Sequence, residues 1–394
     1  MIAEIVIKNI LSFRDEVSLS FEADRSKDFE SYHVVNIAPD VRLLKLGVIY
    51  GANASGKSNF IKAYGLIKDF LTKVPKSKAD TTGVSQFLLD ENSRHEPSLF
   101  GITFYAKLND KYVKFVYSLT LTNDHIIGES LLYYPTSQPA VVFERGIDNG
   151  VSIIKFGNKI KLTTTAKEEI TLRCLPNMSL FAAYMQLNIN ILEIESVLSY
   201  FKTQEVYTSE IFSLYGLNGL LSDEIEDLQY ALNYLKAADF NVTEINRDNK
   251  NNIIFKHLIK GEDGVGSSYE LPIDCESRGT IRTLDIAKYV QSAINNNAFL
   301  AVDEIESSLH PKLVEYIIER FLQESECAQM LVTTHYDGLL AQDDLLRKDN
   351  IWFTEKGDDG SSTLYPLTDF KALNRLSSLQ KAYKFGKFGA IPNI

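Results

Sequence analysis

The chain has 394 residues, 45% apolar and 24% charged, which is enough for two folded domains or for one large domain carrying an inserted one. No apolar run approaches the ~20 residues that span a bilayer, and Glu4 interrupts the N-terminal segment, which excludes a membrane anchor and a signal peptide. Three scattered cysteines without metal-ligand spacing indicate a reducing cytoplasm: Cys174, Cys275 and Cys327.

The net charge of −11 excludes a protein whose whole surface binds nucleic acid. Residues 370–394 nevertheless carry no acidic side chain and five basic ones: Lys371, Arg375, Lys381, Lys384 and Lys387. This basic tail is interleaved with Tyr383, Phe385 and Phe388. It either contacts nucleic acid or an acidic partner, or forms a last helix docked on the acidic body.

The N-terminal region predicts strands followed by a loop and a helix. Apolar and polar residues alternate at residues 5–7 and 17–21, which is typical of strands. The apolar run 43–50 predicts one buried strand that ends in Gly51. Apolar residues at near-helical spacing then predict a helix over 59–71.

The loop between this strand and helix reads Gly-x-x-x-x-Gly-Lys-Ser. In such a loop the backbone N–H groups point at phosphate oxygens, the lysine offers charge to the β- and γ-phosphates, and the serine hydroxyl suits Mg²⁺. The flanking strand and helix are the context that the motif requires. The expected nucleotide-binding residues are Gly51, Asn53, Ala54, Ser55, Gly56, Lys57, Ser58 and Asn59.

The middle of the chain predicts two further regions. Residues 72–85 are polar and predict an exposed loop, whereas residues 87–161 contain apolar runs separated by turns such as Asn109-Asp110 and Asn149-Gly150. This pattern predicts antiparallel hairpins attached to the first half of the core.

Helical periodicity begins at residue 189. Two apolar faces are formed by Ile191, Ile194, Leu198 and Phe201, and by Ile225, Leu228, Leu232 and Leu235. Ser222 is the expected N-cap of the second helix, with Asp223 and Glu224 favourable in its first turn. No heptad pattern is sustained, so we expect a compact helical insertion rather than a coiled coil.

Strands and helices alternate again from about Asn251. In ESRGT (276–280), Ser277 and Gly279 precede an apolar-periodic helix, where a hydroxyl and unpaired N–H groups make either an anion site or a simple helix cap. Its place 26 residues before Asp303 favours the anion site.

Two later apolar strands end in polar residues. After residues 298–302, Asp303 is placed to hold the water shell of Mg²⁺ and Glu304 to polarise an attacking water. The alternative, that the pair caps the following helix, leaves the phosphate loop unexplained. His335 follows the strand 329–334, and ligands collect at such strand ends. Its ring is either structural or hydrogen-bonds the γ-phosphate or the attacking water.

In this order the four elements resemble the ATP-binding cassette (ABC) ATPases of the SMC, RecF and OLD branch, and in particular the bacterial AAA ATPases of abortive infection and phage defence, including the AbiL and Septu ATPases. The resemblance covers most of the chain and is carried by IKNILSF, GANASGKSNF, FLLDENSRHEPSLFGITFY, ESRGT, LAVDEIESSLHP, TTH and YKFGKFGAIP. It implies an α/β ABC-ATPase head with a mixed sheet, an antiparallel β subdomain and a compact helical insertion. The expected boundaries are 1–188, 189–250 and 251–394.

The resemblance also implies residue roles. These are Lys57 and Ser58 (Walker A), Asp303 and Glu304 (Walker B), His335 (switch histidine), Ser277 and Gly279 (signature), Ser307 and Leu309 (D-loop), and Gln186 (glutamine loop). The implied Mg²⁺ ligands are Ser58, Asp303 and Gln186, the last at the end of a predicted strand. The usual signature is Leu-Ser-Gly-Gly, but here Arg278 replaces one glycine and either adds charge at the phosphate or faces solvent.

In this family two chains pack head-to-tail, so Ser277 of one chain would face Lys57 of another across ATP. The resemblance therefore implies a homodimer or a higher even-numbered oligomer. The expected function is an ATP-hydrolysing sensor or regulator in bacterial anti-phage defence, controlling a separate effector protein such as a nuclease or toxin. Three alternatives remain open: a DNA-repair ATPase of the RecF and SMC kind that binds DNA directly, a transporter nucleotide-binding subunit, and an ATP-binding scaffold with slow turnover. The altered signature and the lack of an aromatic A-loop near the start disfavour the transporter subunit.

Overall fold

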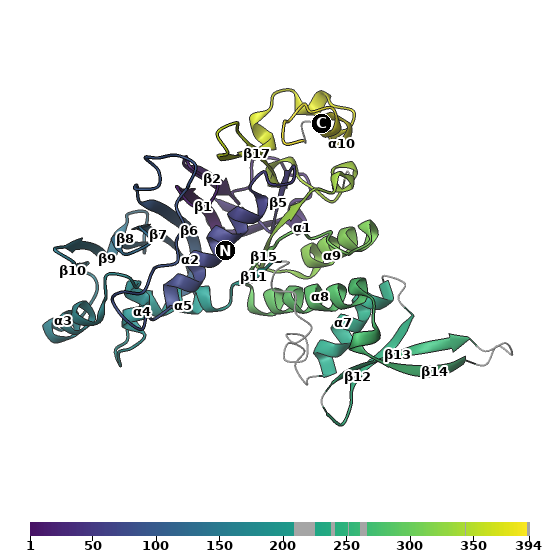
Figure 1. Ribbon diagram of the computed structural model, residues 1–394, viewed down its shortest axis with the longest axis horizontal. Coiled ribbons are helices and arrows are strands. Elements are labelled where there is room, and N and C mark those ends of the chain that lie inside the picture. Colours follow the sequence, from purple (N-terminus) through teal and green to yellow (C-terminus); the bar gives the residue numbers. More distant parts are fainter. Residues whose placement is uncertain (209–224, 238–240, 251, 261–265, 343, 392–394) are drawn as a thin grey trace.

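The computed structural model describes residues 1–208, 225–237, 241–250, 252–260, 266–342 and 344–391 (Figure 1). Within these ranges the strands form four sheets. None of the helices described is both long and apolar enough to cross a membrane.

The largest sheet has seven strands in the order β10-β9-β8-β7-β6-β1-β2, and every neighbouring pair is antiparallel. Its strands are β1 (Ile2–Lys8), β2 (Val17–Ser20), β6 (Ser98–Leu108), β7 (Lys111–Leu121), β8 (Ile126–Tyr134), β9 (Ala140–Asp148) and β10 (Val151–Phe156). The predicted hairpins are confirmed, and their turn residues Asn109, Asp110 and Asn149 have φ values of 50°, 62° and 48°.

A second sheet has six strands in the order β11-β15-β16-β5-β17-β18. Its neighbours are parallel except for the last pair, which is antiparallel, so the expected mixed sheet is confirmed. Its strands are β5 (Leu46–Gly51), β11 (Glu205–Tyr207), β15 (Phe299–Val302), β16 (Gln329–Thr334), β17 (Ile351–Lys356) and β18 (Ser362–Pro366).

Two smaller sheets contain β3 (Val34–Ala38) with β4 (Val41–Leu44), and β12 (Val242–Arg247), β13 (Ile253–Lys260) and β14 (Gly266–Pro272). The α-helices are α1 (Glu30–His33), α2 (Lys57–Thr72), α3 (Thr164–Arg173), α4 (Leu180–Tyr184), α5 (Leu192–Lys202), α7 (Ile225–Ala237), α8 (Arg278–Asn296), α9 (Pro311–Glu324) and α10 (Leu379–Lys384). Short 3-10 turns are η2 (Ile273–Cys275), η3 (Asp337–Ala341), η4 (Lys348–Asn350), η5 (Leu367–Asp369) and η6 (Leu373–Arg375).

The six-stranded sheet lies between two hydrophobic cores. Along β5, Ile49 faces the core that contains α2 and the antiparallel sheet, whereas Val48 faces the core that contains α8 and α9. Strands β5, β15 and β16 are buried along their whole length, as expected for parallel strands covered on both faces. In Figure 1 the antiparallel sheet lies on one side of the six-stranded sheet, and α7, α8 and α9 lie on the other.

The single strand predicted over residues 43–50 is wrong. The chain forms β4, which pairs antiparallel with β3, and after Lys45 it enters β5 in the mixed sheet. The Lys45 ammonium is buried and donates to the carbonyls of Leu322 (3.4 Å) and Ser325. An apolar run does not show where a strand changes partners, because pairing is decided by distant segments.

Three further secondary-structure predictions for the first half are confirmed. Helix α2 contains the expected apolar face, and the polar segment predicted as a loop over 72–85 has no helix or strand after Thr72, the last residue of α2. Helix α5 buries Ile194, Leu198 and Phe201 against the first core.

Residues 189–250 contain more than helices. Besides α5 and α7, this range supplies β11, which pairs in parallel with β15, and β12 of the three-stranded sheet. The predicted cap residues Ser222, Asp223 and Glu224 lie outside the described residues. The division of the chain at residues 188 and 250 stays a prediction.

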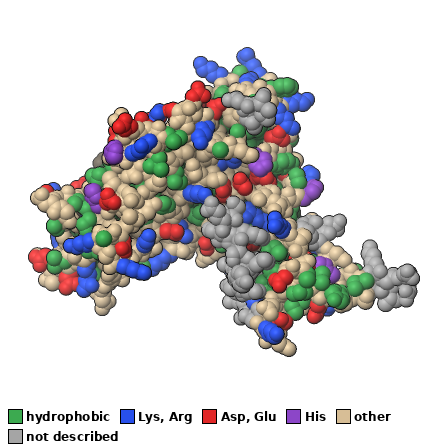
Figure 2. All heavy atoms as spheres, in the orientation of Figure 1, with side chains coloured by type: hydrophobic (Ala, Val, Ile, Leu, Met, Phe, Trp, Pro, Cys, Tyr) green, Lys and Arg blue, Asp and Glu red, His purple; other side chains and the backbone are tan. Residues whose placement is uncertain are grey.

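The C-terminal segment packs against the rest of the protein, as the interpretation of a docked last helix predicted. Tyr383 of α10 stacks on Phe353 with ring centroids 5.7 Å apart, and Lys384 pairs with Asp337 at 3.2 Å. Phe385 is 87% exposed. Figure 2 shows Lys and Arg side chains gathered on this end of the molecule.

Candidate nucleotide site

The phosphate loop connects β5 to α2, and its shape requires both glycines. Gly56 has a φ of 120°, and a Cβ there would collide with the Ser362 side chain. A Cβ on Gly51 would collide with the hydroxyls of Ser55 and Thr354. Ala54 has a left-handed φ of 62°. The loop is therefore a tight turn closed from behind by β17 and β18.

Lys57 is buried at the start of α2, and its ammonium donates to the carbonyls of Gly51 (2.8 Å) and Ala52 (3.0 Å). Burial lowers the pKa of Lys57, and the carboxylates of Glu306, Glu304 and Asp303 act in the opposite direction. The loop lysine is thus close enough to the acidic residues that follow β15 to interact with them electrostatically.

The three strands that carry the site residues are neighbours. Strand β16 pairs in parallel with β15 and with β5, with Val302 opposite Val332 and Tyr50 opposite Thr334. Because these strands are parallel and in register, their carboxyl ends meet at one edge of the sheet. Lys57, Asp303 and His335 follow those ends, so segments far apart in sequence converge there.

The residues after β15 have a strained backbone held by two other elements. Glu304 has a φ of 48°, which costs about 1–3 kcal/mol for a non-glycine residue. Its N–H donates to the Thr333 hydroxyl (2.8 Å), which in turn donates to Asp303 Oδ1 (2.6 Å). The Arg282 guanidinium of α8 donates to the carbonyls of Asp303 (3.3 Å) and Glu304 (3.2 Å), and stacks 4.3 Å from the Tyr207 ring.

The alternative interpretation of Asp303 and Glu304 as a helix cap is wrong. Helix α9 begins at Pro311, and its N-cap is His310, whose side chain accepts from the N–H of Lys312 at 3.2 Å. The sequence analysis did not identify Thr333 or Arg282, because a lone threonine in a strand and a lone arginine in a helix have no distinguishing pattern.

His335 follows β16, and its side chain is 58% exposed. Its Nδ1 and its backbone N–H both contact Glu306 Oε1 at 2.7 Å. The sequence analysis also missed Glu306, although the DEIE pattern places it only two residues after Glu304.

A family model described as "AAA domain, putative AbiEii toxin, Type IV TA system" matches residues 46–341, which include the phosphate loop, both acidic residues and His335. The chain belongs to this AAA family. The sequence-based resemblance to AAA ATPases of abortive infection is therefore confirmed.

No curated protein sequence matches the chain. Among solved structures, an SMC head domain from Thermotoga maritima is similar at 14% identity with a TM-score of 0.42, covering 93% of this chain and 98% of that one. An SMC head bound to the C-terminal winged-helix domain of ScpA is similar at 14% identity with a TM-score of 0.44, covering 97% and 99%.

In this AAA-family chain the segment ESRGT (276–280), predicted to be the signature, leads into α8. Ser277 is the N-cap residue, and its hydroxyl accepts from the N–H of Thr280 at 3.0 Å. The helix-cap interpretation is thus confirmed locally, and a contact between Ser277 and a γ-phosphate stays a prediction. Ser277 and Arg278 are exposed, and Gly279 is half-buried.

The strand predicted to end at Gln186 is wrong. Residues 180–184 form α4, which is capped by the Ser179 hydroxyl accepting from the N–H of Ala182 at 3.0 Å. A short apolar run does not distinguish a strand from a buried helix, and here the cap decides for the helix. Gln186 is exposed and donates to the carbonyl of Ala182 at 3.2 Å. Its role in a glutamine loop stays a prediction.

Across the residues that the structure describes, no cluster of three or more His, Cys, Asp and Glu side chains is placed to hold a metal by itself. A Mg²⁺ site of a different kind, with few protein ligands, fits the donor atoms at the strand ends. A hydroxyl (Ser58) and a buried carboxylate (Asp303) suit Mg²⁺, which keeps several waters and is bound by one or two protein groups together with phosphates.

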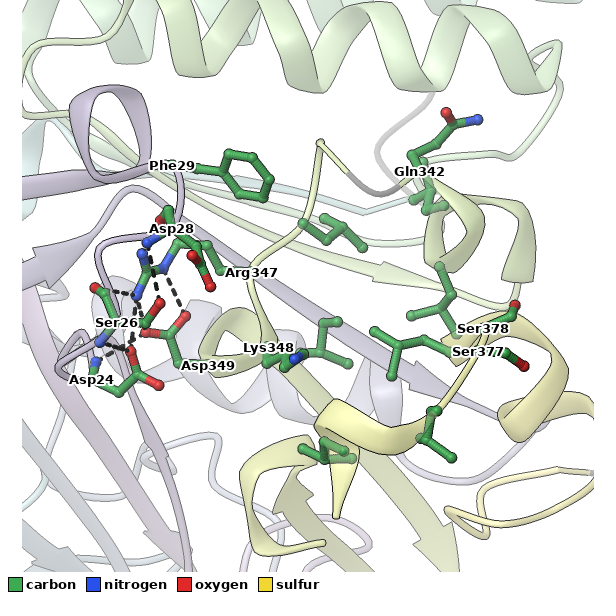
Figure 3. Close-up of a pocket in the computed structure, with 17 residues that line it drawn as sticks. Asp24, Ser26, Asp28, Phe29, Gln342, Arg347, Lys348, Asp349, Ser377 and Ser378 are labelled. Atoms are coloured by element: carbon green, nitrogen blue, oxygen red, sulfur yellow. Dashed lines mark hydrogen bonds and ion pairs between the residues drawn. The ribbon is translucent and has the colours of Figure 1, made fainter. Parts of the chain in front are cut away.

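A separate cavity of about 450 Å³ contains none of the predicted site residues in its lining. Figure 3 shows Arg347 enclosed on one side of it, bonded to Asp349 (2.7 Å), Asp24 (3.0 Å) and the carbonyl of Asp28. These bonds tie the segment 24–28 to η4, so the charges in this cavity serve the fold.

Proposed function

We propose that this chain is a Mg²⁺-dependent ATPase whose nucleotide state regulates a separate effector in bacterial anti-phage defence. The observation that supports it most is the adjacency of β5, β15 and β16, whose ends bring Lys57, the pair Asp303 and Glu304, and His335 to one edge of the sheet. The family description, which refers to an AbiEii toxin and a toxin–antitoxin system, supports the defence context.

The proposed chemistry uses the chain's residues as follows. The phosphate loop binds the phosphates, and Lys57 exchanges its contacts with the loop carbonyls for the β- and γ-phosphates. Asp303 and Ser58 would hold Mg²⁺, and the ion would supply positive charge next to the phosphates. Glu304 polarises the attacking water, and its strained backbone is held by Thr333 and Arg282 before ATP arrives.

The proposed assembly is a head-to-tail dimer. Ser277 and Arg278 are exposed at the N-terminus of α8, where a second chain has access to them. A helix N-terminus with a hydroxyl is a suitable contact for the γ-phosphate of ATP held by the other chain. Each dimer would then contain two shared sites, and ATP would shift the population from separate chains to joined ones.

The test combines phosphate-release assays with light scattering on the purified chain. Lys57→Ala should not bind ATP, and Glu304→Gln should bind ATP, lower kcat by about 10²–10⁴-fold and remain dimeric.

Lys57→Ala and Ser277→Arg should each be inactive alone. Mixed in equal amounts with subunit exchange, they should recover about a quarter of the wild-type rate, because half of the dimers contain one intact site. Wild-type turnover in Glu304→Gln would refute the catalytic assignment, and a mixture without recovery would refute the shared site.

A further inference from the structure

Glu306 is a carboxylate at the nucleotide site to which the proposed chemistry gives no role. It lies two residues after Glu304, and its side chain is only 11% exposed. Its Oε1 accepts from the backbone N–H of His335 and contacts the ring Nδ1, both at 2.7 Å. Its Oε2 is buried and has no hydrogen-bond partner in the described part of the chain. Burying a carboxylate is costly, and His335 provides the compensation.

Glu306 also acts electrostatically on the phosphate loop. The pKa of Lys57 is lowered by burial, and Glu306 opposes this more than Glu304 or Asp303 does. The pKa of the Tyr50 hydroxyl on β5 is raised by burial and, next, by Glu306. Glu306 therefore lies inside the nucleotide site rather than on a remote surface.

We infer that Glu306 is a positioning residue that fixes the ring orientation and the tautomer of His335, an inference that rests on the proposed ATPase function. A carboxylate accepts hydrogen bonds only, so the His335 nitrogen that faces it, Nδ1, carries the hydrogen. The backbone N–H of His335 donates to the same Glu306 oxygen, which holds that oxygen beside the ring at the turn that follows β16.

This tautomer determines what the other ring nitrogen does. With the hydrogen on Nδ1, the Nε2 of a neutral ring is an acceptor. An acceptor suits the hydrogen of an attacking water and does not suit an ionised phosphate oxygen, which needs a donor. Glu306 therefore fixes which ring nitrogen faces the nucleotide site: Nε2 accepts from the attacking water when the ring is neutral and donates to phosphate when it is protonated, while Glu304 retains its separate role as the polarising base.

The direct test observes the tautomer in the full-length protein labelled with ¹⁵N-histidine. Long-range ¹H–¹⁵N spectra at pH 8 distinguish the two neutral tautomers, and among the six histidines the His335 signals are those lost in His335→Ala. Wild type and Glu306→Gln, whose amide oxygen still accepts, should carry the hydrogen on Nδ1. Glu306→Ala should change to the Nε2–H form, and the matched control Glu304→Gln should not. A wild-type signal from Nε2–H, or an unchanged signal in Glu306→Ala, would overturn the inference.

The kinetic test asks whether the two residues act as one unit. Glu306→Ala should lower kcat by about 10–100-fold, as loss of an orienting partner does, with KM changed less than about twofold. Glu306→Gln should recover most of kcat. In a His335→Ala background Glu306→Ala should have no further effect, and independent, additive losses would contradict the pairing. A wild-type chain without ATPase activity would refute the proposed function, and the tautomer spectra would still decide the role of Glu306.

Discussion

The hydroxyl of Thr333 is the contact on which the geometry of Asp303 and Glu304 depends. It donates to Asp303 Oδ1 at 2.6 Å and accepts from the N–H of Glu304 at 2.8 Å, and the side chain is fully buried. Thr333→Val retains the β-branched shape and removes only these two hydrogen bonds. The substitution therefore isolates the support of Glu304 from the packing of β16.

Three contributions determine how much Thr333→Val should lower the free energy of unfolding. The bond to the Asp303 carboxylate is worth about 1.5–3 kcal/mol, and a Glu304 N–H left without a partner costs about 1–3 kcal/mol. The left-handed backbone of Glu304 costs about 1–3 kcal/mol and relaxes once its N–H is released. Since the contributions overlap, we expect the free energy of unfolding to fall by about 2–4 kcal/mol. A misplaced Glu304 should lower kcat by about 10–100-fold, since 1.4 kcal/mol corresponds to tenfold.

The assay compares Thr333→Val with Thr82→Val, a matched control. Thr82 is also buried, and its hydroxyl donates to the carbonyls of Thr122 (2.7 Å) and Asn123 (3.1 Å), which lie in the turn between β7 and β8. Both variants should unfold at lower denaturant concentration, but only Thr333→Val should lose kcat. Equal kcat values for Thr333→Val and wild type would refute the idea that this hydroxyl holds the catalytic geometry.

Two further predictions concern stability. Burial lowers the pKa of His33 to about 4, so the folded protein keeps this ring neutral, whereas the unfolded chain protonates it near pH 6.5. The free energy of unfolding should therefore fall by about 3 kcal/mol as the pH is lowered from about 6.5 to 4. In thermal unfolding measured across this pH range, His33→Phe should show a smaller loss of stability than wild type. Arg145 is fully buried and bonded to Glu129 at 2.9 Å, so Arg145→Met, which leaves that carboxylate unpaired, should cost about 3–5 kcal/mol in chemical denaturation. Stability equal to wild type in Arg145→Met would mean that Glu129 is neutral in the folded state.

Much of the site could be predicted from sequence because its signals are local. The glycines and lysine of the phosphate loop have fixed spacing, and the apolar runs that end in Asp303 and His335 are strands with polar ends. Their convergence also follows from a general property of parallel sheets, whose carboxyl ends meet at one edge. These local features were sufficient to predict an α/β chain and the residues that meet at its candidate nucleotide site.

The secondary-structure predictions were wrong where a local sequence pattern is compatible with two different structures. The run over 43–50 became two strands in different sheets, and the run before Gln186 became a helix, because short apolar segments adopt the structure that their distant neighbours can pair or pack with.

The sequence by itself determined the chemical groups of the candidate site: a lysine and a serine that we propose for phosphates and metal, a carboxylate pair, and a histidine. Only the tertiary structure decided how they are supported. Thr333 and Arg282 hold the strained Glu304, and the His335 ring contacts the carboxylate of Glu306 rather than that of Glu304. Such support comes from single side chains on separate elements, which have no spacing rule in the sequence and become neighbours only when the sheet assembles.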